Sequence, residues 1–232
     1  MKKFMRCCFR FRASKGTTVT FGLCLNLFFW GISNCSLPDP YDRVILKLVD
    51  GNPHQLSVKE YSLIAETLIR KQPCNLLIFG VGNDSALWME LNKGGYTLFL
   101  EDNMYWLQHI QEKLPSIQVY PVHYSTKRSE WKKLLKDSDP NSLHMHLPQQ
   151  ILDTQWDIIF VDAPEGYNDT KPGRMNSIYM AALLAHRKDS STDVFIHDCD
   201  REVEAAYSTY FLHNENLQTT VDRLRHYVIS KP

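Results

Sequence analysis

The chain has no excess of charge of either sign: its 232 residues include 26 lysines and arginines and 26 aspartates and glutamates. This balance gives no whole-chain reason to expect a nucleic acid as partner, because such partners favour basic domains. Hydrophobic residues make up 44% and charged residues 22%, which excludes a disordered chain and a membrane protein of many helices. No internal repeat is visible. The length fits one domain with a short appendage.

Cysteine is scarce in the part of the chain that can form a domain. Four of the six cysteines lie in or beside the N-terminal leader: Cys7, Cys8, Cys24 and Cys35. Only Cys74 and Cys199 lie further on. Cys74 precedes the first expected strand and Cys199 follows the fifth, so they should lie at opposite ends of a sheet and should not pair. This excludes a disulfide scaffold.

Acidic residues are absent from residues 1–15, which hold six basic residues, and charged residues of both signs are absent from Gly16 to Pro38. The pattern predicts a cytosolic basic tail (1–15) followed by a signal anchor that spans the membrane (16–38), with the rest lumenal. A cleaved signal peptide is the alternative, because the apolar run Phe21–Ile32 is short and Ser33-Asn34-Cys35 offers small residues for cleavage. Both interpretations place the domain in the secretory pathway.

Prolines and polar residues follow the leader. We interpret residues 39–55 as a stem, with a short helix around Val44–Val49. The domain is predicted to run from residue 56 to residue 232. Ser57 and Glu60 form a capping-box pattern ahead of a helix, which Pro73 closes.

Strand and helix patterns then alternate, which predicts an α/β fold with a doubly wound, mostly parallel sheet. The expected strands are Asn75–Phe79, Tyr96–Leu100, Gln118–Val122, Trp156–Val161 and Asp193–His197, with a terminal pair near Gln218–Val221 and Arg223–Ile229. The expected helices between them are Ser85–Asn92, Met104–Leu114, Ser129–Lys136, Gly173–His186 and Glu202–Leu212.

A glycine turn follows the first expected strand, where small residues let a ligand approach a helix N-terminus. We predict cofactor binding by Gly80, Gly82, Asp84 and Glu101, the last ending the second strand at the spacing that reaches ribose hydroxyls. A dinucleotide site wants a third glycine where this chain has Ser85, so S-adenosylmethionine is favoured over NAD. The alternative is that Gly80 and Gly82 only form a tight turn and that Glu101-Asp102 caps the next helix.

Acids also follow the fourth and fifth strands, at the edge of the sheet where ligands bind. Asp162, His197 and Asp198 are the candidate catalytic residues, because a carboxylate or histidine could take the proton of a hydroxyl that is being methylated. Asp162 and Asp198 are also candidate ligands of a divalent metal ion. The alternatives are helix capping for Asp198 and a structural histidine for His197.

The polar loop between these strands is a candidate lid. Tyr167, Lys171 and Arg174 are its candidate substrate-binding residues, with the two cations suited to an anionic sugar. Solvent-exposed cations without such a role are the alternative.

Five motifs in this order resemble those of one family. They are Pro73–Gly82, Gly95–Asp102, Trp156–Pro164, Pro172–Met175 and His197-Asp198. Over roughly Leu56–Ile229 the chain is similar to the plant polysaccharide-biosynthesis domain family, whose best characterised members are the glucuronoxylan 4-O-methyltransferases. Two departures are Asn83, where members carry a histidine or basic residue, and the lack of a cysteine pair in Asp137–Gln150.

The resemblance implies a class I S-adenosylmethionine-dependent methyltransferase fold acting on the 4-hydroxyl of glucuronic acid side chains of glucuronoxylan, a cell-wall polysaccharide. It also implies a single-pass type II protein of the Golgi membrane with its catalytic domain in the lumen. It places Gly80, Gly82 and Glu101 at the cofactor, Asp162, His197 and Asp198 at the reaction centre, and Arg174 against the uronate.

Two other family activities stay open: methylation of glucuronic acid on arabinogalactan, and a non-catalytic role in xylan assembly of the irregular-xylem type. The motif Val161–Pro164 followed by Gly166-Tyr167 is more similar to the methyltransferase branches. A nicotinamide dehydrogenase is disfavoured by Ser85.

Overall fold

The structure is a computed structural model that describes residues 39–52, 55–137, 140–187 and 189–230. The predicted basic tail and signal anchor lie outside the described residues. Among the residues that are described, no helix has both the length and the apolar character needed to cross a membrane.

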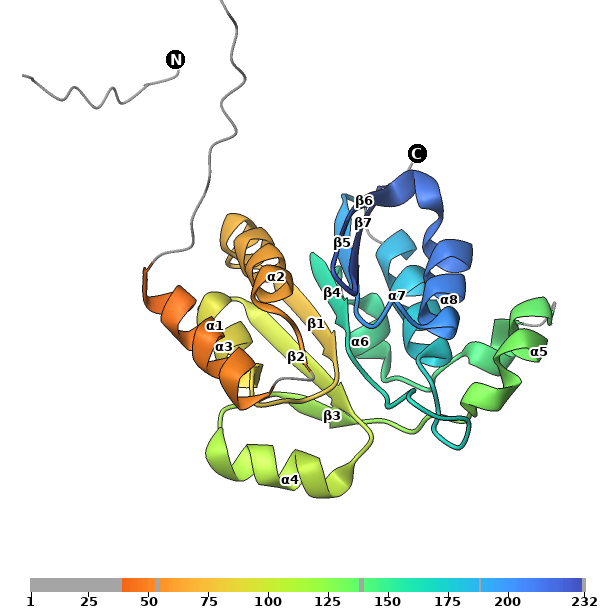
Figure 1. The fold of residues 1–232 in the computed structure, drawn as a ribbon, viewed down its shortest axis with the longest axis horizontal. Coiled ribbons are helices and arrows are strands. Elements are labelled where there is room, and N and C mark those ends of the chain that lie inside the picture. The colour runs from red at the N-terminus through yellow and green to blue at the C-terminus, as the bar shows by residue number, and fades with distance from the viewer. Residues whose placement is uncertain (1–38, 53–54, 138–139, 188, 231–232) are drawn as a thin grey trace, which may run out of the picture. The chain divides into compact units, whose positions relative to one another are not determined.

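Helices and strands alternate through most of the chain, as expected (Figure 1). The strands are β1 (Asn75–Phe79), β2 (Tyr96–Glu101), β3 (Val119–Pro121), β4 (Ile158–Val161), β5 (Thr192–Ile196), β6 (Leu217–Val221) and β7 (Leu224–Ile229). The helices are α1 (Asp39–Gly51), α2 (Val58–Lys71), α3 (Ser85–Leu91), α4 (Met104–Lys113), α5 (Trp131–Lys136), α6 (Gln149–Asp153), α7 (Met175–Arg187) and α8 (Glu202–Leu212). Short 3₁₀ turns occupy Arg128–Glu130, Pro140–Leu143 and Asn214–Asn216.

The strands form one seven-stranded sheet in the order β3-β2-β1-β4-β5-β7-β6. The first five strands of this order are parallel, and β7 pairs antiparallel with both β5 and β6. The prediction of a doubly wound, mostly parallel sheet is therefore confirmed. Because the chain leaves β1 for β2 on one side and β4 lies on the other, the strand order reverses between β1 and β4. Ligands of such sheets bind at this switch point.

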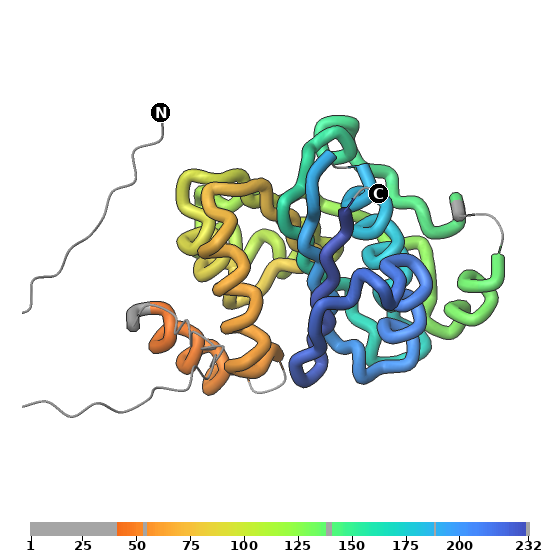
Figure 2. The backbone as a smooth tube through the Cα atoms, turned by 90° about the horizontal axis from the view of Figure 1, so that it is seen from above, coloured from red at the N-terminus to blue at the C-terminus, as the bar shows by residue number. Residues whose placement is uncertain are grey.

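Alternate side chains of the buried strands face two separate layers of helices, as the period of two requires. Leu76 and Ile78 of β1 pack in a core with residues of α1, α2, α3 and α4. Leu77 and Phe79 pack in a second core with residues of α6, α7 and α8. Figure 2 shows the orange α1 and α2 on one side of the strands and the blue α7 and α8 on the other.

The segment interpreted as a stem contains a 13-residue helix, α1, which is longer than the expected turn around Val44–Val49. Ile45 is 1% exposed and belongs to the same core as Leu56 and Ile64. The prolines that suggested a linker lie at the first turn of the helix and just beyond its end, positions at which proline does not interrupt a helix. Residues 39–51 therefore pack with the domain.

Other differences from the predicted elements are small. Helix α6 was not expected, because five residues are too few to show helical periodicity. The expected helix Ser129–Lys136 is divided between a 3₁₀ turn and α5. Cys74 and Cys199 are both buried, at opposite ends of the parallel strands, so they do not pair with each other.

Candidate functional site

A cleft of about 700 Å³ opens at the carboxyl ends of β1, β2, β4 and β5, across the switch point. This volume is in the range of small-molecule sites. Every residue that the sequence predicted for the site lines it: Gly80, Gly82, Asp84, Glu101, Asp162, Tyr167, Lys171, Arg174, His197 and Asp198. The prediction that these residues gather at one edge of the sheet is confirmed. Their roles depend on the contacts that each side chain makes.

The glycine turn after β1 is packed too closely for a larger residue. Gly80 has a φ of +110°, and a Cβ atom on it would lie 3.0 Å from the Cβ of Ala163. The turn is tied to β2 because Glu101 accepts hydrogen bonds from the backbone N–H of Val81 (2.9 Å) and of Asn103 (2.8 Å). Burial raises the pKa of Glu101. Gly80 and Glu101 thus fix the backbone that would face a cofactor.

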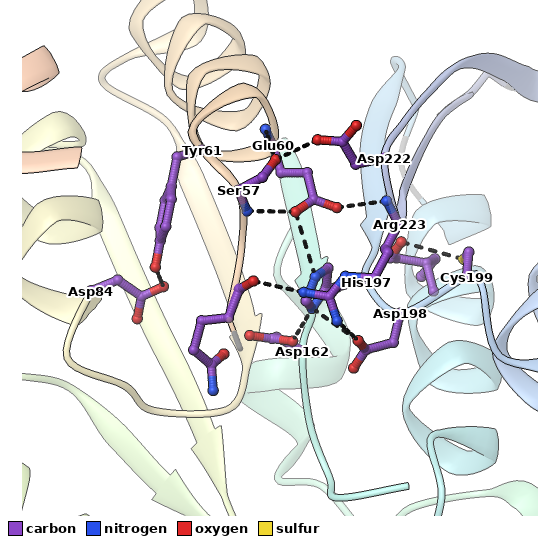
Figure 3. Close-up of polar contacts among 12 residues, drawn as sticks. Ser57, Glu60, Tyr61, Asp84, Asp162, His197, Asp198, Cys199, Asp222 and Arg223 are labelled. Atoms are coloured by element: carbon purple, nitrogen blue, oxygen red, sulfur yellow. Dashed lines mark hydrogen bonds and ion pairs between the residues drawn. The ribbon is translucent and has the colours of Figure 1, made fainter. Parts of the chain in front are cut away.

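Asp84 ends this turn and does not cap α3 with its side chain. Its carboxylate folds back over Gly82, with Oδ1 2.6 Å from where a Cβ of that glycine would be, and accepts a hydrogen bond from the Tyr61 hydroxyl at 3.4 Å (Figure 3). Burial, and then the negative charge of Asp162, raise the pKa of Asp84 to about 6. An acid held in this way favours a cationic ligand beside it.

Asp162 and His197 face each other across the ends of β4 and β5. His197 Nδ1 lies 2.8 Å from Asp162 Oδ1, and the other ring nitrogen points to Glu60 Oε2 at 3.8 Å (Figure 3). Burial alone would lower the pKa of His197, but the charge and hydrogen bond of Asp162, with Glu60 and Asp198, raise it to about 9. His197 therefore keeps its proton at neutral pH and donates to Asp162, which does not suit the predicted role of proton acceptor.

Asp162 keeps access to the cleft, with 18% of its side chain exposed. Burial opposes its charge, yet the charges of His197 and Arg174 hold the pKa of Asp162 below the usual value. Asp162 is thus an ionised carboxylate at the edge of the cleft, with its orientation fixed from one side.

Arg174 does not face the cleft as a free cation, contrary to the expectation that it holds the uronate. Its side chain is 5% exposed. Its Nη2 atom lies 3.1 Å from Asp162 Oδ1 and 2.8 Å from Asp198 Oδ2, while Nη1 donates to the His197 carbonyl (3.0 Å) and Nε to that of Pro164 (3.3 Å). All three guanidinium nitrogens have partners within the protein, so Arg174 holds the carboxylates of Asp162 and Asp198 in place.

Asp198 is buried and has a φ of +60°, which aspartate tolerates better than most residues. Its carboxylate contacts Arg174, Arg201 (3.0 Å) and Arg223 (2.9 Å). A carboxylate shared by three guanidinium groups is poorly placed to attack or to accept a proton. The predicted catalytic role of Asp198 is therefore better described as charge compensation between arginines.

Asp162 and Asp198 were also predicted as possible ligands of a divalent metal ion. Asp162, His197 and Asp198 each offer a ligand atom, and these atoms lie within 4.8 Å of one another. The guanidinium of Arg174 already bridges both carboxylates, so a divalent ion bound there would have to displace it. The arrangement as it stands does not fit a metal ion, and the metal stays a prediction.

The loop after β4 carries the remaining predicted residues. Lys171 forms an ion pair with Glu165, and its Nζ lies 5.2 Å from the ring centre of the exposed Tyr167. Both Tyr167 and Lys171 line the cleft, as a substrate-binding role requires.

The residues near the site that were missed from the sequence include Tyr61, Glu60, Arg201 and Arg223. Glu60 is fully buried and accepts the backbone N–H of Arg223 at 2.8 Å, across a sequence separation of 163 residues. The capping-box pattern revealed Glu60 as part of a helix start, and both capping bonds are present. Its approach to His197 depends on long-range packing, which a local pattern does not contain.

The fold and the strand-end cleft define the class: this is an α/β protein with the class I S-adenosylmethionine-dependent methyltransferase fold. Among solved structures, a putative caffeoyl-CoA O-methyltransferase from Staphylococcus aureus superposes with a TM-score of 0.50, over 82% of this chain and 92% of that chain, at 13% identity. Within this class, the chain belongs to the IRX15/IRX15L/GXM family, whose sequence profile matches residues 59–145 and 141–227.

Relatives from Arabidopsis thaliana include three kinds of protein. Glucuronoxylan 4-O-methyltransferase 2 is 41% identical over 75% of this chain and 66% of its own length. Arabinogalactan O-methyltransferase 2 is 37% identical over 75% of this chain and 67% of its own. Protein IRREGULAR XYLEM 15 is 36% identical over 86% of this chain and 69% of its own. The chain thus spans about two thirds of the length of these relatives.

Proposed function

We propose that this chain is an S-adenosylmethionine-dependent O-methyltransferase that acts on the 4-hydroxyl of glucuronic acid side chains of glucuronoxylan. The observation that carries the proposal is the cleft itself, in which the turn of Gly80 and the acid Glu101 lie on one side of the switch point and the ionised Asp162 on the other. A protein that used this fold only as a scaffold would not need this arrangement.

The residues on the cofactor side fit S-adenosylmethionine. Gly80 leaves no side chain on the turn, where a Cβ atom would lie 3.0 Å from that of Ala163, and Asp84 offers a carboxylate to a cationic group. The side chain of Ser85 accepts the N–H of Gly82 at 3.0 Å, in place of the third glycine of a dinucleotide site. When bound, S-adenosylmethionine would supply an electrophilic methyl group on a sulfonium, whose S–CH3 bond breaks on transfer so that the sulfur leaves as a neutral thioether.

On the acceptor side, Asp162 takes the proton that the sugar hydroxyl loses as its oxygen bonds to the methyl carbon. Because the pKa of Asp162 is held low, the carboxylate is ionised and ready to accept a hydrogen bond from that hydroxyl. His197 and Arg174 hold Asp162 from behind and stay charged throughout.

The choice of acceptor rests on the relatives. Three named glucuronoxylan 4-O-methyltransferases are 41%, 40% and 38% identical to this chain, against 37% and 34% for two arabinogalactan O-methyltransferases. Arabinogalactan is therefore the second candidate acceptor. A non-catalytic role in xylan assembly is the candidate from another class, favoured by the 36% identity to Protein IRREGULAR XYLEM 15.

The test uses the full chain, S-adenosylmethionine with a labelled methyl group, and two acceptors, unmethylated glucuronoxylan and arabinogalactan. We expect label on glucuronoxylan. Label on arabinogalactan alone would make arabinogalactan the acceptor in place of glucuronoxylan. A folded protein that does not bind the cofactor would favour the assembly role. A parallel reaction with a chelator tests the metal: lost activity would mean that an ion displaces Arg174 from the two acids.

We further propose that the chain is a single-pass protein of the Golgi membrane with residues 39–232 in the lumen. The basic residues of positions 1–15 and the uncharged segment Gly16–Pro38 support this orientation. A fluorescent fusion at the C-terminus should co-locate with Golgi markers and resist protease until the membrane is opened. Removal of residues 1–38 should abolish that location, and a secreted fusion would indicate a cleaved signal peptide instead.

A further inference from the structure

A uronic acid acceptor needs a cation close to the reaction centre. Its carboxylate stands on C5, next to the C4 that bears the reacting hydroxyl, so the group that recognises it must lie near Asp162. Among the described residues, the cleft is lined by four cationic or basic side chains: Lys171, Arg174, His197 and Arg201. Only a cation with donors to spare and access to the cleft can hold the carboxylate.

Two of the four are excluded by their contacts. Arg174 is buried, and all three of its nitrogens have partners within the protein. His197 is buried between Asp162 and Glu60. A third, Lys171, lies on the loop, where its ammonium already forms an ion pair with the Glu165 carboxylate.

Arg201 differs from these three. It precedes α8, 29% of its side chain is exposed, and Nη1 contacts Asp198 Oδ2 at 3.0 Å. Arg174 and Arg223 contact that same carboxylate, so Arg201 shares Asp198 with two other guanidinium groups. Among the described contacts of Arg201, the ion pair with Asp198 is made by Nη1, which leaves N–H donors of its exposed guanidinium for a ligand in the cleft.

The position of Arg201 also matches the chemistry. Arg174 Nη2 bridges Asp198 and Asp162, so Arg201 is linked to the carboxylate at the reaction centre through Asp198 and then Arg174. Glu204, one turn along α8, is buried, and its Oε1 lies 2.8 Å from where a Cβ atom of Gly166 would be. A guanidinium pairs with a carboxylate through two parallel hydrogen bonds.

We propose that Arg201, and not Arg174, binds the carboxylate of the uronic acid acceptor. The inference deepens the proposed function and rests on it for the identity of the acceptor. It assigns specificity to a residue that the sequence motifs did not single out.

The test measures binding without methyl transfer, by calorimetry with two xylo-oligosaccharides. One carries unmethylated glucuronic acid, and the other carries the same side chain reduced to glucose. We expect the protein to prefer the uronate, and Arg201→Gln to weaken uronate binding at least about tenfold while leaving the reduced ligand nearly unchanged. Arg187→Gln removes the same charge from an exposed position, where Arg187 donates to the Leu152 carbonyl, and should change neither.

Arg201→Lys is measured beside these variants because it keeps the positive charge. It also keeps the inference testable if Arg201→Gln does not fold. It should retain the preference for the uronate with weaker affinity, since an ammonium cannot pair bidentately. The inference is overturned if the wild type does not prefer the uronate, or if Arg201→Gln keeps the preference or loses both ligands equally. If binding is as expected but no methyl is transferred in the labelled assay, the proposed function fails and this inference stands.

Discussion

At the residue scale, the acids of the cleft differ in their partners rather than in their chemistry. Asp198 is surrounded by arginines, Asp162 is held by His197 and Arg174 from one side, and Asp84 has the Tyr61 hydroxyl. The pKa of Asp162 is accordingly low, whereas that of Asp84 is raised to about 6. This contrast assigns the acceptor proton to Asp162 and a cationic ligand to Asp84.

Asp162→Asn tests the first assignment. The amide cannot take a proton, so we expect methyl transfer to fall by a factor of about 10²–10⁴ while cofactor affinity changes little. Rapid-quench transfer assays and calorimetry measure the two quantities. Asp200→Asn removes an exposed neighbouring acid and serves as the control. Unchanged turnover in Asp162→Asn would remove that residue from the mechanism.

Asp84→Asn tests the second assignment. Because the folded-state pKa of about 6 is above the ordinary 3.8, folding loses stability as the pH rises from 3.8 through 6. At pH 7 the variant should therefore be more stable, by on the order of 1 kcal/mol, and should bind S-adenosylmethionine more weakly. The wild-type affinity should fall as the pH drops below 6, since the carboxylate then becomes neutral.

Urea denaturation and calorimetry between pH 5 and pH 8 check both parts. The assignment fails if Asp84→Asn binds the cofactor as the wild type does across this range, or if its affinity keeps the wild-type pH dependence.

At the element scale, the buried parallel strands were the most predictable part of the chain. β1 and α8 have the predicted bounds because a continuous apolar run and a helix start with acidic residues in its first turn are local signals. The packing of α1 could not be predicted from its prolines. Nor could the contact by which the β6–β7 turn docks on α2, where Ser57 Oγ donates to Asp222 at 2.7 Å across 165 residues. Such pairs depend on the complete fold.

Ile45→Ala tests whether α1 belongs to the domain. Ile45 is 1% exposed, so its truncation should leave a cavity and lower the free energy of unfolding by about 2–4 kcal/mol. Leu46→Ala is the matched control, because Leu46 is 51% exposed on the same helix and should change stability by less than about 0.5 kcal/mol. Equal effects of the two substitutions in urea denaturation would indicate that α1 does not pack as described.

At the scale of the whole molecule, the strand order determines where the chemistry is located. The reversal between β1 and β4 brings the glycine turn, the acids of β4 and β5 and the loop Glu165–Arg174 to one cleft. The sequence predicted this gathering because strand ends can be identified from local patterns. It did not predict that Arg174 is buried or that His197 holds its proton, since both follow from partners brought together by folding.

The position of the transferred methyl group tests the central claim most directly. The full chain is incubated with unmethylated glucuronoxylan and S-adenosylmethionine carrying a ¹³C-methyl group, and the product is analysed by heteronuclear NMR. We predict a correlation between the labelled methyl group and C4 of glucuronic acid, which Asp162→Asn should not produce. Label on another hydroxyl, on the carboxylate as an ester, or on no part of the polysaccharide by a folded, cofactor-binding protein would contradict the account.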